Sequence, residues 1–132
     1  MQIFTLKKRK YFVEAAKGYK AVANGIVIQA ASNLSAQTSA DGCCFVGFTA
    51  TKKLGKAHLR NRTKRRLRAI AQSILPTNAL TGVNYVFIGR HNTATLEFSY
   101  LCRKALQALD EVNRQISSFG DSYAQKSDDC NH

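Results

Sequence analysis

The chain has 132 residues, with twenty Lys and Arg against eight Asp and Glu, and a formal net charge of +12. An apolar fraction of 45% suits one globular domain and argues against wholesale disorder, and no apolar run reaches the ~18 residues that a membrane span needs. Residues 1–75 hold fifteen basic and two acidic groups, which predicts a polyanion-binding face there. Nucleic acid is the leading partner, and an anionic membrane surface is the alternative.

The first part of the chain predicts a helix and a strand. Residues 1–5 form a loose lead-in, residues 6–19 predict a helix that Gly18 stops, and residues 22–31 predict a strand, with an extra short strand before or within them as an option. Basic residues 7–10 crowd the first helical turn, where the helix dipole disfavours cations, so we interpret them as serving binding. The apolar face of the helix consists of Tyr11, Phe12, Ala15, Ala16 and Tyr19.

The next segments predict a turn and a second strand. Residues 32–42 are polar and small, with Asp41-Gly42 as the turn signal. Residues 43–50 predict a strand, because side chains alternate between its two faces. The face expected on the core carries Cys44, Val46, Phe48 and Ala50, and the other face carries Phe45, Gly47, Thr49 and Thr51.

The most basic stretch, TKKLGKAHLRNRTKRRLR, covers residues 51–68, with nine basic and no acidic side chains between positions 52 and 68. A loop over 52–56 containing Gly55 is predicted to lead into a helix over 57–75, which Pro76 ends. At about 100° per residue this helix is amphipathic. Its packed stripe comprises Leu59, Leu67, Ile70, Ala71, Ile74 and Leu75, and its polar side comprises Asn61, Arg62, Lys64, Arg65 and Arg68.

The last segments predict a connector over 77–82, a strand over 83–89, a turn over 90–94 and a final helix. Thr95 is the expected N-cap of that helix, and Glu97 lies in its first turn. Its apolar stripe is Phe98, Leu101, Ala105, Ala108, Leu109, Val112 and Ile116. From about Ser117 the sequence is polar and small, so we expect one domain over 1–116 and a flexible tail over 117–132.

This order of elements predicts a small two-layer α/β (α+β) sandwich, in which three helices pack on a mixed sheet of about four strands. No familiar enzyme motif is present, and the acids Glu14, Asp41 and Glu97 are too scattered to form a metal-binding nuclease centre. His58 and His91 are interpreted as surface or partly packed side chains. The sequence therefore predicts no catalytic and no metal-binding residue, and no small-molecule cofactor.

The four cysteines, Cys43, Cys44, Cys102 and Cys130, lack the spacing of a zinc site. We interpret them as small buried side chains in a reducing compartment, which predicts a cytoplasmic protein. Aromatic rings beside basic residues have two interpretations, since they can stack on unpaired bases or pack in the core. Both remain open for Phe12, and the core is favoured for Tyr11.

Residues 45–68, FVGFTATKKLGKAHLRNRTKRRLR, closely resemble the signature of the protein subunit of bacterial ribonuclease P. The matching positions are Gly47, Lys52, Lys53, Gly55, Ala57, Arg60, Asn61, Arg62, Lys64, Arg65 and Arg68. The opening LKKRKYF, the segment VNYVFIGR and the last helix also fit in order, so the resemblance covers about residues 6–116. It implies a left-handed β-α-β connection around the basic helix, against the usual right-handed rule.

The resemblance also implies a function. The chain would be the accessory subunit of an endoribonuclease, assisting a catalytic RNA that uses magnesium to remove the 5′ leader from precursor tRNA. The RNA-binding residues would be Lys52, Lys53, Lys56, Arg60, Asn61, Arg62, Lys64, Arg65, Arg66 and Arg68. A groove between the first helix and the sheet would hold the single-stranded leader, through Phe12, Thr49 and Thr51.

The chain departs from the family pattern at three positions. Phe45 stands where Arg is frequent, and Ala16 and Gln29 stand where groove aromatics are common. Fewer rings mean fewer stacking partners, each worth ~1–3 kcal/mol per base. An alternative function is a non-enzymatic RNA- or ribosome-binding module of similar fold.

Overall fold

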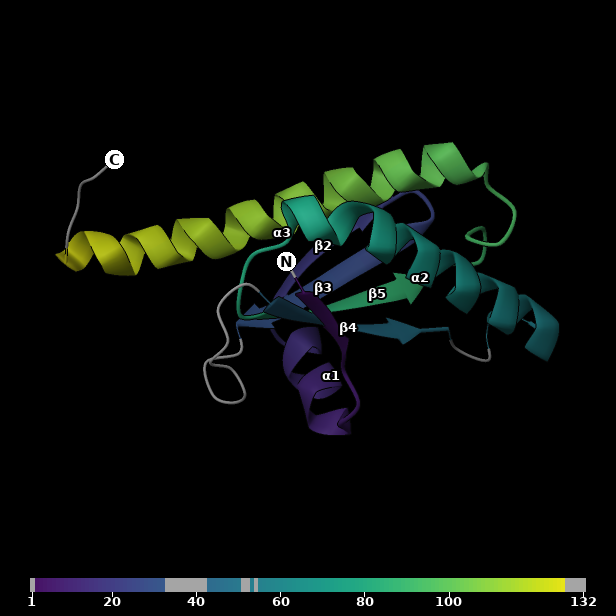
Figure 1. The fold of residues 1–132 in the computed structure, drawn as a ribbon, viewed down its shortest axis with the longest axis horizontal. Helices are drawn as coiled ribbons and strands as arrows, with labels where there is room; N and C mark the ends of the chain where they lie inside the picture. The colour runs from purple at the N-terminus through teal and green to yellow at the C-terminus, as the bar shows by residue number, and fades with distance from the viewer. Residues whose placement is uncertain (1, 33–42, 51–52, 54, 128–132) are drawn as a thin grey trace.

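The computed structural model describes residues 2–32, 43–50, 53 and 55–127, with side chains described as far as residue 118. These residues form five strands and three helices in one sheet-and-helix unit (Figure 1). The elements are β1 (Gln2–Thr5), α1 (Arg9–Ala16), β2 (Tyr19–Ala23), β3 (Ile26–Ser32), β4 (Cys43–Thr49), α2 (Ala57–Asn78), β5 (Val83–Gly89) and α3 (Phe98–Ser127). Within these residues, no helix is both long and apolar enough to cross a bilayer.

The sheet is mixed, with the strand order β1-β4-β5-β3-β2. β1 and β5 both run parallel to β4, with Phe4 beside Phe45 on one side and Phe48 beside Phe87 on the other. β3 runs antiparallel to β5, and β2 runs antiparallel to β3. The predicted α/β (α+β) sandwich with three helices is confirmed, and the sheet has five strands where about four were expected.

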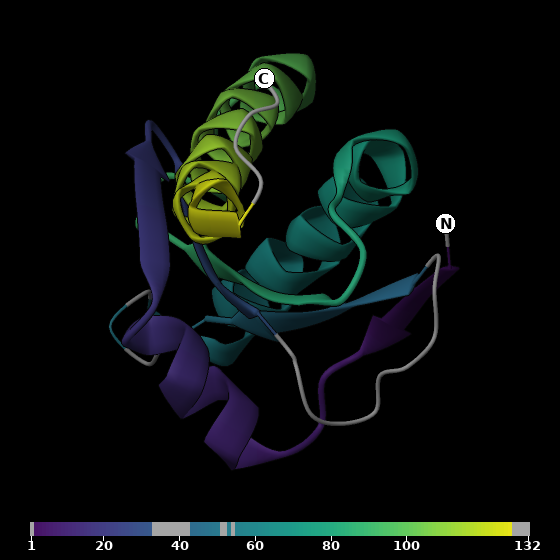
Figure 2. The ribbon, with the colours of Figure 1, turned by 90° about the vertical axis from the view of Figure 1, so that its left-hand side faces the viewer.

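Helices cover both faces of this sheet, as Figure 2 shows, with α2 and α3 on one face and α1 on the other. The sandwich therefore has three layers where two were predicted. The main core lies under α2 and α3. Its largest fully buried side chains are Tyr85, Phe87, Ile26, Ile28, Leu67, Ile70, Leu75, Leu101, Leu109 and Val112. Cys44, Val46 and Phe48 also belong to this core, as the alternation in β4 predicted.

A buried tyrosine joins the two helices of this face. The Tyr85 hydroxyl donates to Asn113 Oδ1 of α3 at 2.6 Å and accepts from the Leu80 amide, in the connector after α2, at 2.9 Å. Burial raises the pKa of Tyr85, so the phenol stays protonated and both bonds are kept. These bonds satisfy the one polar atom of a side chain that is otherwise enclosed by the core.

The connection from β4 through α2 to β5 is left-handed. Both strands point to the right in Figure 1 and therefore away from the viewer in Figure 2, where the chain passes from β4 over the upper face to β5 in an anticlockwise sense. Parallel connections are right-handed in about 98% of cases. A right-handed connection here would place α2 on the face that α1 covers, so the handedness puts the basic helix and α1 on opposite faces.

In the first part of the chain, the prediction of a loose lead-in over residues 1–5 was wrong, and the optional extra strand near residues 22–31 is present. Residues 1–5 include β1, which forms because four residues pair with β4 at the sheet edge. The segment predicted as a strand over 22–31 is part of a hairpin of β2 and β3, turned by Asn24-Gly25. Gly25 has φ +93°, and a Cβ there would lie 2.7 Å from a Leu96 side-chain atom, so glycine is required.

Helix ends also differ from the predictions. α1 spans half of the predicted 6–19, because the residues before it reach β4 and Tyr19 begins β2. α2 continues past Pro76 to Asn78, because the fixed φ of proline is compatible with a helix. Pro76 has no backbone N–H, so only one hydrogen bond of the last turn is lost. Thr95 does not cap α3; its hydroxyl donates to Asn92 O, and the helix begins at Phe98.

Strands β4 and β5 lie where the sequence predicted them, over Cys43–Thr49 and Val83–Gly89. α3 continues to Ser127, beyond the predicted end near residue 117. Flexibility of residues 117–132 stays a prediction, and the Asp41-Gly42 turn lies outside the described residues. Cys43 and Cys44 are buried and form no disulfide. Burial, and to a smaller extent the charge of the neighbouring Cys43, raises the pKa of Cys44 to about 11.

Candidate nucleic-acid interface

Helix α2 separates its apolar and basic side chains onto two sides. The buried stripe is Thr63, Leu67, Ile70, Ala71, Ile74 and Leu75, which anchors the helix on the sheet. Asn61, Arg62, Arg65 and Arg68 are exposed, and Arg60, Lys64 and Arg66 are half-buried. Lys53 and Lys56, before the helix, are exposed, whereas Lys52 lies outside the described residues. The predicted amphipathic arrangement is therefore present.

Three arginines of α2 are held by backbone carbonyl groups. Arg60 donates to Gly55 O at 2.8 Å, which fastens the loop before the helix to its first turn. Arg62 donates through Nε to Ala94 O at 2.9 Å, and Arg66 donates to Thr93 O at 2.7 Å. Because Arg62 uses Nε, its two terminal nitrogens remain available for phosphate.

Thr93 ties this contact to the sheet. Its side chain is fully buried, its hydroxyl donates to Gly25 O at 2.6 Å, and it accepts from the Arg90 amide at 2.7 Å. α2 is thereby connected through the segment before α3 to the β2–β3 hairpin turn. The sequence did not reveal these carbonyl partners, since they lie 27 and 32 residues from the arginines that they bind.

The basic face carries no carboxylate partner among the described residues. The one ion pair among the described residues lies away from this face and joins Arg114 to Glu111 on α3. Burial lowers the pKa of Arg66, and the neighbouring charge of Arg62 lowers it further, so like charges repel on this face. Two guanidinium groups rest on rings, with Arg66 5.7 Å from the Phe98 centroid and Arg68 5.8 Å from the Phe48 centroid.

The opposite face of the sheet brings Phe12 and Thr49 onto one side of β4. A Cβ at Gly47 would lie 2.4 Å from Phe12 Cζ, so the ring lies directly over this glycine. Thr49 is the next residue on the same face of β4, and it is partly exposed beside Ile88 of β5. Thr51, the third predicted groove residue, lies outside the described residues.

Phe12 is both a packing residue and a partly exposed one. It is half-buried against a second cluster formed by Leu6, Ala15 and Val86. Ala16, one turn later on α1, is exposed, and Gln29 on β3 is half-buried. The two interpretations of Phe12 are therefore compatible, because one part of the ring packs while the rest faces solvent.

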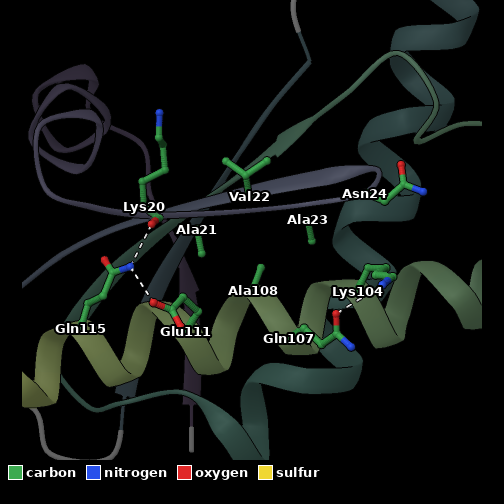
Figure 3. Close-up of a pocket in the computed structure, with 10 residues that line it drawn as sticks. All are labelled: Lys20, Ala21, Val22, Ala23, Asn24, Lys104, Gln107, Ala108, Glu111 and Gln115. Atoms are coloured by element: carbon green, nitrogen blue, oxygen red, sulfur yellow. Dashed lines mark hydrogen bonds between the residues drawn. The ribbon is translucent and has the colours of Figure 1, made fainter.

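A hollow of about 470 Å³ lies between the edge strand β2 and helix α3 (Figure 3). Gln115 bridges it, donating to Lys20 O at 3.1 Å and to Glu111 at 3.2 Å. Small side chains line its floor, among them Ala21, Ala23 and Ala108, and no aromatic ring of the described residues does. This hollow therefore lacks the rings on which unpaired bases stack, and the carboxylate of Glu111 lies in its lining.

Comparison with known proteins decides the family. The sequence model of the family described as Ribonuclease P matches residues 3–113, most of the chain. The chain belongs to the ribonuclease P protein family. The family resemblance noted at residues 45–68 is confirmed, and so is the predicted function at this level: the chain is a ribonuclease P protein component.

Relatives within the ribonuclease P family align along most of their length. The ribonuclease P protein component of Caulobacter vibrioides is 37% identical over 127 residues, covering 96% of this chain and 83% of the relative. The ribonuclease P protein component of Paramagnetospirillum magneticum is 41% identical over 108 residues, covering 81% of this chain and 80% of the relative.

Solved structures of ribonuclease P proteins share the fold. The protein from Thermotoga maritima has a TM-score of 0.63 and 23% identity, covering 83% of this chain and 96% of that one. A Staphylococcus aureus ribonuclease P protein mutant with defective mRNA degradation activity has a TM-score of 0.69 and 20% identity, covering 83% and 88%. At these identities the likeness concerns the fold alone.

Membership of the ribonuclease P family makes this chain an accessory subunit of a hydrolytic ribonucleoprotein, with the ribonuclease P RNA as its partner. His58 and His91 are exposed, as surface residues were expected to be. The chemistry that the described residues offer is recognition: fixed cations on α2, and a ring beside a hydroxyl on the other face.

Proposed function

We propose that the basic face of α2 and the loop before it dock on the ribonuclease P RNA. We further propose that the groove between α1 and β4 holds the unpaired 5′ leader of precursor tRNA while the RNA subunit cleaves it. The RNA-docking residues are Lys52, Lys53, Lys56, Arg60, Asn61, Arg62, Lys64, Arg65, Arg66 and Arg68. The leader-groove residues are Phe12, Thr49 and Thr51.

The arrangement of charge on α2 carries the docking proposal. A cationic row without carboxylate partners in the described part of the chain, on a helix anchored by a buried apolar stripe, repels itself in the free protein. Phosphates relieve that repulsion and release condensed counterions as they bind. Arg65 is exposed, and its side chain forms no hydrogen bond or ion pair with the described residues, so it is the side chain best placed to meet a phosphate.

The leader proposal depends on Phe12 and Thr49. An unpaired base can stack on the exposed part of the Phe12 ring, worth ~1–3 kcal/mol, and the Thr49 hydroxyl can bond a phosphate or base edge. Paired bases in an RNA helix present no free ring face. The groove is therefore suited to the single-stranded leader rather than to the folded body of tRNA.

We place magnesium on the RNA subunit, by the family resemblance. Within the described part of the chain no three His, Cys, Asp or Glu side chains gather where they could hold a metal ion, so the residues do not fit a protein-bound magnesium centre. A cytoplasmic location likewise stays a proposal, supported by the unbridged state of Cys43, Cys44 and Cys102.

Reconstitution tests the overall function. The full chain is mixed with its cognate ribonuclease P RNA and precursor tRNA at low magnesium, and cleavage is compared with that by RNA alone. We expect faster cleavage or tighter substrate binding with the protein. A chain that binds RNA but leaves cleavage unchanged is instead a non-enzymatic RNA- or ribosome-binding module.

Salt dependence tests the docking face. In Arg65→Ala the slope of log K against log salt for ribonuclease P RNA should flatten by about 0.7–0.9 for each phosphate that the variant no longer neutralises. Arg114→Ala is the matched control, because Arg114 is also exposed but is paired with Glu111 on α3. Equal slopes for wild type and Arg65→Ala would remove the phosphate-contact assignment.

The groove is tested by comparing substrates. Phe12→Ala in the holoenzyme should weaken precursor tRNA binding by about fivefold or more, the low end of a stacking contact, and leave mature tRNA binding unchanged. Equal losses for both RNAs would assign the ring to packing. Circular dichroism of the free variant checks that the fold survives.

A further inference from the structure

A hollow of about 210 Å³ lies where β1 leads into α1, apart from the groove residues Thr49 and Thr51. Its lining combines aromatic, basic and small polar side chains: Thr5, Leu6, Lys7, Lys8, Tyr11 and Phe45. Among the described residues, no acidic side chain lines it. This combination is what unpaired nucleotides bind, since rings stack on bases and lysines meet phosphates.

Two phenylalanines of neighbouring strands extend the hollow at the sheet edge. Phe4 of β1 and Phe45 of β4 are register partners, with ring centroids 5.6 Å apart and planes inclined by 32°. β1 is a short edge strand with no strand beyond it among the described residues, and Phe4 is 46% exposed there. The Phe4 ring contacts Phe45, and its exposed part offers a surface on which a base can stack.

The charges around the hollow also lack a structural reason. Lys7, Lys8, Arg9 and Lys10 are exposed at the start of α1, where the helix dipole opposes cations and no acidic side chain occupies the first turn. Lys10 lies 5.2 Å from the centroid of Tyr11, which brings a cation beside a ring of the hollow. A nucleotide backbone would offset this unfavourable placement.

We propose that this hollow binds unpaired nucleotides of the 5′ leader that lie beyond those on Phe12. The proposal rests on the leader groove described above. Phe12 and Phe45 pack in the same cluster, and positions 45 and 47 on one face of β4 are about 7 Å apart, the length of about two stacked bases. The first turn of α1 then supplies the phosphate contacts.

The position of α2 sets the direction of the leader. Thr49 ends β4 at the end of the molecule where α2 begins. Because α2 is proposed to dock on the RNA subunit that cleaves, we place the leader nucleotides nearest the cleavage site at this end. Phe45 and Phe4 lie farther back along the strands. The hollow therefore holds nucleotides toward the 5′ end of the leader, and short leaders do not reach it.

A leader-length series tests this assignment in the holoenzyme. Precursor tRNAs with leaders of increasing length, from two nucleotides to about ten, are titrated against wild type, Phe4→Leu and Phe45→Leu. Leucine keeps the apolar contact and removes the ring. Both variants should bind long leaders about fivefold or more weakly and short leaders normally. Val22→Ala is the control, since Val22 is also an exposed apolar side chain (63%) but lies on β2, at the opposite edge of the sheet.

The outcomes separate this site from the groove. Loss of the same size at every leader length, or no loss, overturns the hollow as a leader site while leaving a length-independent effect of Phe12→Ala intact. Normal binding by Phe12→Ala with length-dependent loss in Phe45→Leu overturns the groove instead. If Phe4→Leu and Phe45→Leu bind the ribonuclease P RNA more weakly, the hollow is a site for that RNA. If they lose a dimer that the wild-type protein forms in sedimentation, the hollow binds a second copy of the chain. Either result overturns the proposal.

Discussion

Gly47→Ala tests how β4 and Phe12 fit together. The added Cβ would lie 2.4 Å from Phe12 Cζ and 2.6 Å from Cε2, closer than carbon atoms approach, so the ring must leave its place. The backbone itself accepts alanine, because Gly47 does not have a positive φ. The substitution therefore moves one ring without breaking the strand.

The expected magnitude follows from two opposed effects. Alanine in a strand is about 0.5–1 kcal/mol more favourable than glycine. Moving a half-buried phenylalanine off its cluster loses about half of the ~1.5–3 kcal/mol that full burial contributes. Gly47→Ala should then be slightly destabilising in wild type. In a Phe12→Ala background, where no ring is in the way, the same change should stabilise the protein by about 0.5–1 kcal/mol.

Guanidinium unfolding of the four proteins measures this coupling, which should be about 0.8–1.5 kcal/mol. Gly47→Ala should also lower the preference of the holoenzyme for precursor over mature tRNA, as is expected for Phe12→Ala. Equal effects of Gly47→Ala in both backgrounds would show that the ring does not lie over Gly47. Coupled stability with unchanged leader discrimination would show that its position is not used for the leader.

Three further predictions concern stability. Arg62→Ala should lower the free energy of unfolding by about 1–2 kcal/mol because Ala94 O loses its donor, while Arg65→Ala should stay within about 0.5 kcal/mol; similar losses contradict the structure. The pKa of Cys44 rises from 9.0 to about 11 on folding, so the folded protein keeps the thiol protonated where the unfolded chain loses its proton. The free energy of unfolding should therefore fall by roughly 2–3 kcal/mol as the pH rises from 9.0 through about 11. Cys44→Ala should lose that decline, and an unchanged pH profile assigns it to other groups. Pro76→Ala should stabilise α2 by about 1 kcal/mol in thermal unfolding, and a lower midpoint would mean that proline is needed at the helix end.

Local pattern was sufficient where one face of an element is buried along its whole length. β5 has the predicted bounds and β4 ends one residue before its predicted end, because both are largely apolar runs between polar segments. α2 buries five of the six predicted stripe positions; Leu59 is half-buried, and Thr63 is buried in addition. The Asn24-Gly25 turn was also readable from the sequence. The main prediction ran one strand through it, because the apolar residues on its two sides look like one strand, and only the option of an extra short strand allowed for it.

Other features depend on partners far along the chain. β1 has four residues and is a strand because β4, about forty residues later, pairs with it. The carbonyl groups that hold Arg62 and Arg66 belong to an irregular segment whose path no periodicity describes. The sequence predicted charge on α2 correctly, but the division of its arginines between carbonyl contacts and solvent required the fold.

The left-handed connection places the two proposed RNA contacts on opposite faces of the sheet. α2 lies on one face and α1 on the other, yet β4 ends where α2 begins (Figure 1). Thr49 and the first basic turns of α2 therefore meet at the same end of the molecule, although they belong to opposite faces. An RNA docked on Arg60 and Arg65 would bring its cleavage site to that end, and the leader would run from there past Phe12. A right-handed connection would put α2 over the groove itself and block that path.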